Sequence, residues 1–295
     1  SASQSIHALR DEIAKLLQLP SQQVVARHAE GSGCYGHNGA DDVSFDAALL
    51  AMALPGVPVR VQWMREDEFA WEPQGPAMVV QLSATLDADG RIANWNEHIW
   101  GNRHIQRPGR RPEPGLLAAW HQGAGCPMMP ATDMPLPMGG GSQRNAVPYY
   151  DLPAMQVTNH AVIPMPIRVS ALRALGAYVN VFAIESFMDE LALASGQDPV
   201  SFRLRHVSDP RARAVIEAVV RRAQWQPGST GGEGHGVGLA FARYKNIGNY
   251  AAVIAEVELT ERVRVKRVVA AVDCGCIVNP DGCLLYTSDA ADEGL

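Results

Sequence analysis

The chain has 295 residues, of which 47% are hydrophobic and 19% charged, and its formal net charge is −6 at pH 7. This composition is typical of an ordinary globular chain, and the sequence shows no basic stripe interleaved with aromatic residues, which argues against nucleic-acid binding. No run approaches the roughly 18 apolar residues that cross a bilayer, and the 5 cysteines form no CxxC pair, which argues against a zinc site or a disulfide framework.

The first part of the chain shows both helical and extended patterns. Apolar residues at helical spacing predict helices at residues 6–17 and 45–53. Residues 24–26 and 58–63 are apolar or alternate in character and predict short strands. After the second of these, residues 64–68 are expected to turn towards a further helix.

The middle of the chain begins with the firmest local prediction. Residues 78–86 and 92–100 predict two strands, and the Asp-rich connection at residues 87–90 ends in Gly, which favours a hairpin. Residues 101–147 then become rich in Pro, Gly, Arg and Met, and such a long loop is typical of a functional or poorly ordered segment. We interpret Gly139–Gly141 as a flexible linker.

The last part of the chain carries the clearest helix, at residues 181–191, after a strand at residues 157–165. Two Asp-Pro pairs, Asp198-Pro199 and Asp209-Pro210, each place an N-cap before a proline at the first helical position. They predict helices at residues 200–206 and 211–223. Strands are predicted at residues 234–243, 253–259 and 263–272, with Cys274 and Cys276 half-buried at a strand end. This order favours an α+β fold with mixed sheets and packed helices.

The stretch Gly31–Asp42, GSGCYGHNGADD, is the most conspicuous motif, because it lies between a predicted strand and a helix opened by Asp41 and Asp42. Its glycines can bring backbone N–H groups close to a ligand, and the following helix N-terminus adds positive potential. Gly31, Gly33 and Gly36 stand in GxGxxG order, but no acidic residue lies between Asp46 and Glu66, so a dinucleotide site is not predicted. The alternative is an ordinary glycine-rich turn.

Four stretches together resemble the molybdenum-binding subunit of the xanthine dehydrogenase/aldehyde oxidase family, of the type found in isoquinoline 1-oxidoreductase as its beta chain. They are GSGCYGHNGADD with VPVRVQWMREDEF, the long PIRVSALRALGAYVNVFAIESFMDELALASGQDPVSFRLRHVSDPRA, GHGVGLAFARYKN with AAVIAEVEL, and VRVKRVVAAVDCGCIVNPDG. The resemblance implies that the α+β fold is part of the molybdenum-binding domains of that family.

The resemblance also implies an activity. The cofactor would be molybdopterin, in its plain or cytosine dinucleotide form, and the substrate an N-heteroaromatic compound or an aldehyde. Oxidation would proceed by attack of a molybdenum-bound hydroxide and hydride transfer to a sulfido ligand. The implied partners are a small-molecule substrate and an iron–sulfur electron-transfer subunit, with no nucleic acid and no membrane span in this chain.

The resemblance assigns cofactor-binding residues one by one. Gly33, Cys34, Tyr35 and Gly36 match the core of the family's GGGFGG loop, and Leu172–Gly176 matches its FRGFG turn. Within that turn, Arg173 and Ala174 would contact the cofactor. Gln4 matches a Thr-Gln position near the metal. For Tyr35, the alternative to a functional role is a ring packed in the protein. For Arg173, the alternative is a structural ion pair.

The substrate pocket is expected to include Tyr35, His37 and Leu175. His37 replaces the last glycine of the family's loop, and Asn38-Gly39 replaces the Lys-Glu of xanthine-oxidising members, so xanthine is not the expected substrate. His37 is either a general base or a residue that stabilises the helix entry. No residue of this chain is expected to bind the metal directly.

No catalytic residue is expected in this chain, because the family's catalytic Glu lies in a GxGE segment near its C-terminus, which is absent here. The last residues, CLLYTSDAADEGL, resemble a translated sequencing adapter. We therefore expect residues 1–147 to be a first molybdopterin-binding segment, residues 148–282 a truncated second one, and residues 283–295 an adapter read-through in a metagenomic or draft sequence.

Two other functions compete with the enzyme fragment. One is a cofactor-free binding or structural relative with the same fold. The other is a hydrolase that uses Ser32 or Cys34 with His37, although the sequence lacks a nucleophile-elbow motif. The chain starts at Ser1 rather than Met, so we expect a missing N-terminus. The cytoplasm and the periplasm therefore both stay open as its location.

Overall fold

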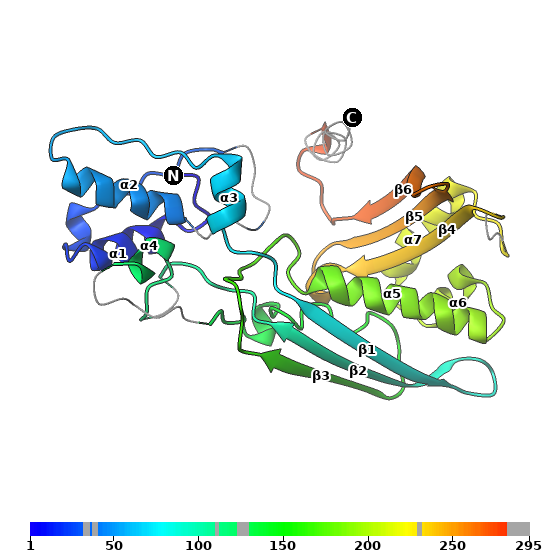
Figure 1. Ribbon diagram of the computed structural model, residues 1–295. Helices are drawn as coiled ribbons and strands as arrows, with labels where there is room; N and C mark the ends of the chain where they lie inside the picture. Colours follow the sequence, from blue (N-terminus) through cyan, green and yellow to red (C-terminus); the bar gives the residue numbers. More distant parts are fainter. Residues whose placement is uncertain (32–35, 37–40, 110–111, 123–129, 229–231, 282–295) are drawn as a thin grey trace. The chain divides into compact units, whose positions relative to one another are not determined.

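The computed structural model describes residues 1–31, 36, 41–109, 112–122, 130–228 and 232–281 (Figure 1). The chain divides into two compact units. The first comprises Ser1–Ser83, Asn96–Ala146 and Gln156–Phe182, and the second comprises Ala84–Trp95, Val147–Met155 and the residues from Ala183 onward. The sequence-based domain boundaries at residues 147 and 282 stay predictions.

The N-terminal part of the first unit is helical. Its elements are α1 (Ile6–Leu16), the 3₁₀ turn η1 (Ser21–Gln23), α2 (Asp42–Ala53), α3 (Arg65–Trp71) and α4 (Leu117–Trp120). Helices α1, α2 and α4 bury a shared apolar cluster, which consists of Leu9, Ile13, Phe45, Leu116 and Ala119. The predictions of helices at residues 6–17 and 45–53 are confirmed, and so is the turn into a helix after Met64.

Two predicted strands of this part are wrong. Residues 24–26 and 58–63 belong to no strand, and Val25 is 75% exposed. Val24 has extended dihedral angles, φ −107° and ψ 121°, but none of the described strands pairs with it. An apolar, alternating sequence favours an extended backbone, whereas a strand also requires a partner that accepts its hydrogen bonds.

The first sheet consists of β1 (Met78–Leu86), β2 (Ile92–Asn102) and β3 (Met155–Val162) in the order β1-β2-β3 (Figure 1). The predicted hairpin is confirmed: the Asp87 N–H donates to the Arg91 carbonyl at 2.8 Å, and Gly90 has a positive φ of 69°. Several side chains of β2 are buried, among them those of Trp95 and Ile99.

Three helices follow, α5 (Ala177–Ala194), α6 (Pro199–Arg205) and α7 (Pro210–Ala223). Both predicted N-caps are confirmed, because Asp198 accepts a hydrogen bond from the Ser201 N–H and Asp209 accepts one from the Arg211 N–H. No described helix is long and apolar enough to cross a membrane.

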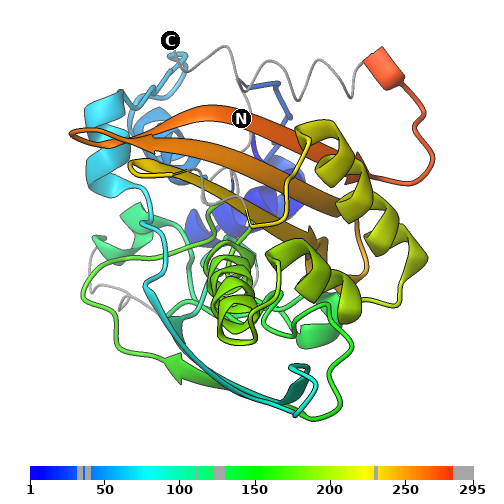
Figure 2. The same cartoon turned by 90° about the vertical axis from the view of Figure 1, so that its right-hand side faces the viewer.

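The second sheet is antiparallel and consists of β4 (His235–Arg243), β5 (Tyr250–Leu259) and β6 (Val263–Asp273), with η3 (Tyr244–Asn246) after β4. Helix α7 packs against β5 and β6 (Figure 2). Leu239, Phe241 and Ile254 are buried within this unit. Cys274 and Cys276 follow β6 and are exposed, so the prediction that they are half-buried is wrong. The mixture of helices and sheets confirms the α+β class.

Candidate functional site

The residues that the sequence assigned to the site all belong to the first unit. Four of them, Gly33, Cys34, Tyr35 and His37, lie outside the described residues, as do Ser32 and the Asn38-Gly39 pair. The described ones are Gln4, Gly36, Arg173, Ala174 and Leu175.

Gly36 brings the glycine loop against the turn that begins at Leu172. A Cβ added to Gly36 would lie 2.4 Å from the carbonyl carbon of Leu172 and 2.7 Å from the backbone nitrogen of Arg173, and the φ of Gly36 is +104°. Only glycine allows two backbones to approach so closely in this conformation. The Gly36 carbonyl accepts a hydrogen bond from the Arg107 guanidinium at 3.2 Å. Two stretches that are far apart in the sequence therefore meet here.

The turn itself has an uncommon backbone. Ala174 and Leu175 are consecutive non-glycine residues with positive φ, 68° and 55°. Such residues are uncommon, and they persist only where the surroundings hold them. Here the Leu175 N–H donates to the Leu172 carbonyl at 3.2 Å, and the Gly176 N–H donates to the Gly141 carbonyl at 3.2 Å. The side chain of Arg173 is exposed.

Gly139–Gly141 supports this turn, so its interpretation as a flexible linker is wrong. Gly140 and Gly141 are buried, and a Cβ on Gly176 would lie 2.5 Å from the Gly141 carbonyl oxygen. The Arg144 guanidinium donates to the carbonyls of Gly139 at 2.7 Å and Gly140 at 2.8 Å. The glycines serve close packing in this segment rather than flexibility.

A buried ion pair ties the start of α2 to the stretch before the turn. The Arg168 guanidinium donates to both Asp42 oxygens, at 2.7 and 2.9 Å, and the Leu117 N–H donates to the same carboxylate at 2.8 Å. Burial raises the pKa of Asp42, and the charge of Arg168 opposes that rise. This pair was not predicted from the sequence, because nothing local links two residues so far apart in the chain.

The N-terminal segment lies against both ends of the glycine loop. The buried Ser3 hydroxyl donates to Asp41 at 2.6 Å, and Ala2 is near Gly31, where an added Cβ would lie 2.9 Å from the Ala2 Cβ. Burial raises the pKa of Asp41 to about 6, against the lowering effect of the Ser3 hydrogen bond. Gln4, the next residue after Ser3, is exposed.

His104, which is 2% exposed, was not predicted from the sequence. Neither of its ring nitrogens has a hydrogen-bond partner within the described part of the chain, while its backbone N–H donates to Asp133 at 2.8 Å. Burial lowers its pKa to about 4, although the Asp133 charge acts in the opposite direction. A lone His in a Pro/Gly-rich loop carries no local signal of this burial.

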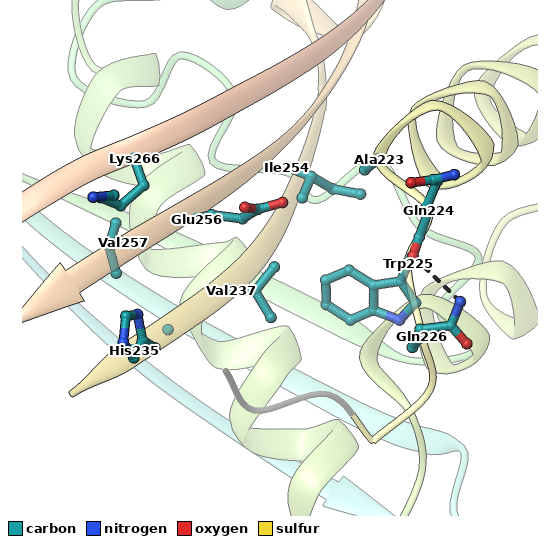
Figure 3. Close-up of a pocket in the computed structure, with 11 residues that line it drawn as sticks. Ala223, Gln224, Trp225, Gln226, His235, Val237, Ile254, Glu256, Val257 and Lys266 are labelled. Atoms are coloured by element: carbon teal, nitrogen blue, oxygen red, sulfur yellow. Dashed lines mark hydrogen bonds between the residues drawn. The ribbon is translucent and has the colours of Figure 1, made fainter. Parts of the chain in front are cut away.

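Elsewhere, a pocket of about 350 Å³ opens in the second unit between the end of α7 and the second sheet (Figure 3). The Trp225 indole lies beside Val237, and Glu256 and Lys266 come from β5 and β6. Of the assigned site residues that the structure describes, none lines this pocket. In the described ranges, no group of three or more His, Cys, Asp and Glu residues could hold a metal ion.

Residues 1–104 and 128–207, more than half of the chain, match the family described as the molybdopterin cofactor-binding domain. The chain belongs to this family. The expected resemblance to the molybdopterin-binding subunits of the xanthine dehydrogenase/aldehyde oxidase family is thereby confirmed, and curated relatives support it.

The chain is 38% identical over 300 residues to a nicotinate dehydrogenase subunit of Pseudomonas putida, covering 96% of this chain and 24% of that protein. It is 29% identical over 256 residues to the beta chain of isoquinoline 1-oxidoreductase of Brevundimonas diminuta, covering 84% of this chain and 30% of that protein. The chain thus spans about a quarter of the first relative and under a third of the second.

The fold is also similar to that of a solved structure. Aldehyde oxidoreductase from Desulfovibrio gigas superposes with a TM-score of 0.59 at 19% identity, covering 90% of this chain and 29% of that chain. At this identity the likeness concerns the fold alone, and it agrees with the α+β class.

Proposed function

We propose that this chain is part of the large subunit of a molybdenum hydroxylase that oxidises N-heteroaromatic compounds or aldehydes. The observation that carries the proposal is the contact between Gly36 and the Leu172–Arg173 backbone, because it joins two of the stretches assigned to the cofactor. The names of the two relatives, a nicotinate dehydrogenase and an isoquinoline oxidoreductase, favour N-heteroaromatic substrates.

The described residues fit a cofactor that is held by backbone amides. Gly36 leaves no space for a side chain, and the Ala174 N–H donates to no acceptor in the part of the chain that the structure describes. Bound molybdopterin, in its plain or cytosine dinucleotide form, supplies the redox chemistry. The residues that we assign to its binding are Gln4, Gly33, Cys34, Tyr35, Gly36, Arg173 and Ala174.

Other residues of the turn and the loop face the substrate in this proposal. Tyr35, His37 and Leu175 line its pocket, and the planar donors of Arg173 orient a polar group of the substrate or of the cofactor. The base that accepts the proton is a Glu outside this chain, in a GxGE segment of the full-length subunit. Loss of such a positioned group costs a factor of about 10²–10⁴ in rate. Because the cofactor contacts made by the rest of the subunit are lost as well, the 295-residue chain alone is inactive in this proposal.

The full-length subunit, on this proposal, passes electrons to a small iron–sulfur subunit. Residues 283–295 are an adapter read-through. Long-read sequencing of the source locus across the codon for Gly282 tests whether residues 283–295 are a read-through and whether a GxGE segment follows in the full-length gene. We expect the reading frame to continue to a GxGE segment, near a gene for an iron–sulfur subunit. A frame that ends at Leu295 would contradict the enzyme and favour a cofactor-free relative.

The recovered full-length gene then allows a direct test of cofactor binding. Expressed in a host that makes molybdopterin, the full-length protein is expected to carry about one molybdenum atom per chain by elemental analysis. The 295-residue chain is expected to carry none. Gly36→Ala should remove the metal from the full-length protein, whereas Gly238→Ala, where an added Cβ meets nothing within 4 Å, should keep it. A metal-free full-length protein would establish the cofactor-free alternative.

A further inference from the structure

The carboxylate of Asp133 is held in place by a short bridge between two loop segments. The Ile105 N–H donates to the Thr132 carbonyl at 2.7 Å, and the Thr132 N–H donates to the Ile105 carbonyl at 2.7 Å. The next residue, Asp133, therefore lies beside His104, and its Oδ1 accepts the His104 N–H at 2.8 Å. Asp133 thus has a fixed position although it belongs to no helix or strand.

The same carboxylate holds Ser142, which is fully buried. The Asp133 Oδ2 accepts a hydrogen bond from the Ser142 hydroxyl at 2.9 Å, and the Ser142 N–H donates to the same oxygen at 3.4 Å. Hydrogen bonds to an ionised carboxylate are stronger than those between neutral groups. Asp133 also packs directly on Gly141, where an added Cβ would lie 1.8 Å from Oδ1. One side chain therefore fixes both residues 141 and 142.

Residues 141 and 142 in turn support the Leu172–Gly176 turn, which we assign to the cofactor. The Gly141 carbonyl accepts the Gly176 N–H at 3.2 Å, and a Cβ on Gly176 would lie 2.3 Å from the Ser142 carbonyl oxygen. The Asn180 side-chain amide, on α5, donates to the Ser142 carbonyl at 2.8 Å. The two consecutive residues with positive φ in this turn persist only with such support from their surroundings.

We propose, on the basis of the function proposed above, that Asp133 is a positioning residue for the cofactor. It holds the Gly141 carbonyl in the place where that carbonyl accepts the Gly176 N–H. The backbone of the Leu172–Gly176 turn is therefore already ordered before the cofactor binds. Such pre-organisation reduces the entropy that is lost on binding.

Hydrogen exchange at single backbone amides, followed by NMR in the isotopically labelled 295-residue chain, tests this positioning. The Gly176 N–H reports the turn. The N–H of Ile99, a buried residue of the central strand β2, reports the opening of the first sheet. We expect Asp133→Ala to speed exchange at Gly176 by about tenfold, which corresponds to the loss of one hydrogen bond, and to change exchange at Ile99 much less.

Ser142→Ala tests the same link with a smaller change, because it removes the hydroxyl hydrogen bond and keeps the backbone. Since both variants break one contact, the double variant should exchange at Gly176 about as fast as Asp133→Ala alone. Glu66→Ala removes an exposed carboxylate on α3 of the same unit, and this matched control should change neither amide.

Two results of the exchange experiment would overturn the positioning role. One is equal acceleration at Gly176 and Ile99 in Asp133→Ala, which would mean a general loss of stability. The other is unchanged exchange at Gly176 in both Asp133→Ala and Ser142→Ala. Where Asp133→Ala fails to fold, Ser142→Ala decides alone.

Elemental analysis of the full-length protein tests the link to the cofactor. Asp133→Ala is expected to carry less molybdenum per chain than the wild type, whereas Glu66→Ala should carry as much. Wild-type molybdenum content in Asp133→Ala, despite faster exchange at Gly176, would overturn the inference. A metal-free wild type would instead overturn the proposed function, and the exchange rates would still decide whether Asp133 holds the turn.

Discussion

Gly36 offers a test of the close approach between the glycine loop and the turn at Leu172. A Cβ at this position would lie 2.4 Å from backbone carbon, and the residue has a φ of +104°. Overpacking of this kind costs about 1–3 kcal/mol, and the backbone conformation adds strain. We expect Gly36→Ala to lower the free energy of unfolding by at least that amount in urea denaturation. Gly238→Ala, which meets open space, is expected to change it by less than about 1 kcal/mol. Equal effects would mean that residues 36 and 172 are not in contact.

The raised pKa of Asp41 predicts an unusual pH dependence of the free energy of unfolding. Its pKa is raised to about 6 in the folded chain because the carboxyl is buried, whereas an unfolded Asp has a pKa near 3.8. The folded state therefore binds the proton more tightly than the unfolded state does. The stability that this proton binding adds is complete below pH 4 and is lost as the pH rises through 6. After allowance for partial exposure, the loss is about 1–2 kcal/mol.

Asp41→Asn is expected to remove this loss, and Asn tolerates the positive φ of 60° at this N-cap. Chemical denaturation at pH 4, 5, 6 and 7 compares the two chains. Their difference isolates Asp41 from His104, whose lowered pKa acts with the opposite sign and adds stability as the pH rises. A constant difference at all four pH values would contradict the raised pKa of Asp41.

Helices α5 and α6 are joined by a buried ion pair, and we expect its loss to lower the stability of the chain strongly. Arg203 is fully buried and donates to Glu185 at 2.9 Å, and the same carboxylate accepts from the Phe241 N–H of β4 at 2.9 Å. Asp189 also pairs with Arg203, at 2.5 Å, but it is partly exposed, so Glu185 is the buried partner of the guanidinium, and breaking a buried pair costs about 3–5 kcal/mol. We expect Glu185→Gln to lower the free energy of unfolding by this amount. Glu217→Gln, in the exposed pair with Arg213, should cost less than about 0.5 kcal/mol.

The elements that the sequence predicted well are those with local signals. The Asp-Pro pairs at the starts of α6 and α7 and the Asp-rich turn between β1 and β2 determine their own backbone. The strands predicted at residues 24–26 and 58–63 failed because pairing depends on distant residues. The interpretation of Gly139–Gly141 as a flexible linker was wrong for a similar reason. A glycine that permits close packing against distant residues and a glycine in a linker look the same in the local sequence.

At the scale of the whole molecule, the family resemblance predicted the fold class, but it did not predict the contacts between the stretches that it assigns to the cofactor. The packing of Gly36 on Leu172 and the pairing of Asp42 with Arg168 join segments whose separation in sequence hides them from any local pattern. The burial of His104 is likewise hidden from any local sequence pattern. Its burial depends on the fold of a Pro/Gly-rich segment that has few helix or strand signals.

The outer face of the second sheet, opposite α7, predicts the behaviour of the isolated chain in solution. By strand register this face carries only Gly, Ala, Val and Leu side chains, which on β6 include Val265 at 64% and Val268 at 56% exposure. Apolar patches of this kind drive association. The face carries no charge, so a second copy of the chain meets no repulsion there.

We therefore expect the 295-residue chain to self-associate with rising concentration in sedimentation velocity experiments. Val265→Glu combined with Val268→Glu should shift it towards the monomer, because the pairing of two such faces would bury uncompensated carboxylates. Val278→Glu is the matched control, since Val278 is 94% exposed beyond the end of β6. Should the wild type stay monomeric, or should Val278→Glu act as strongly as the double variant, the outer face would not be the surface that associates.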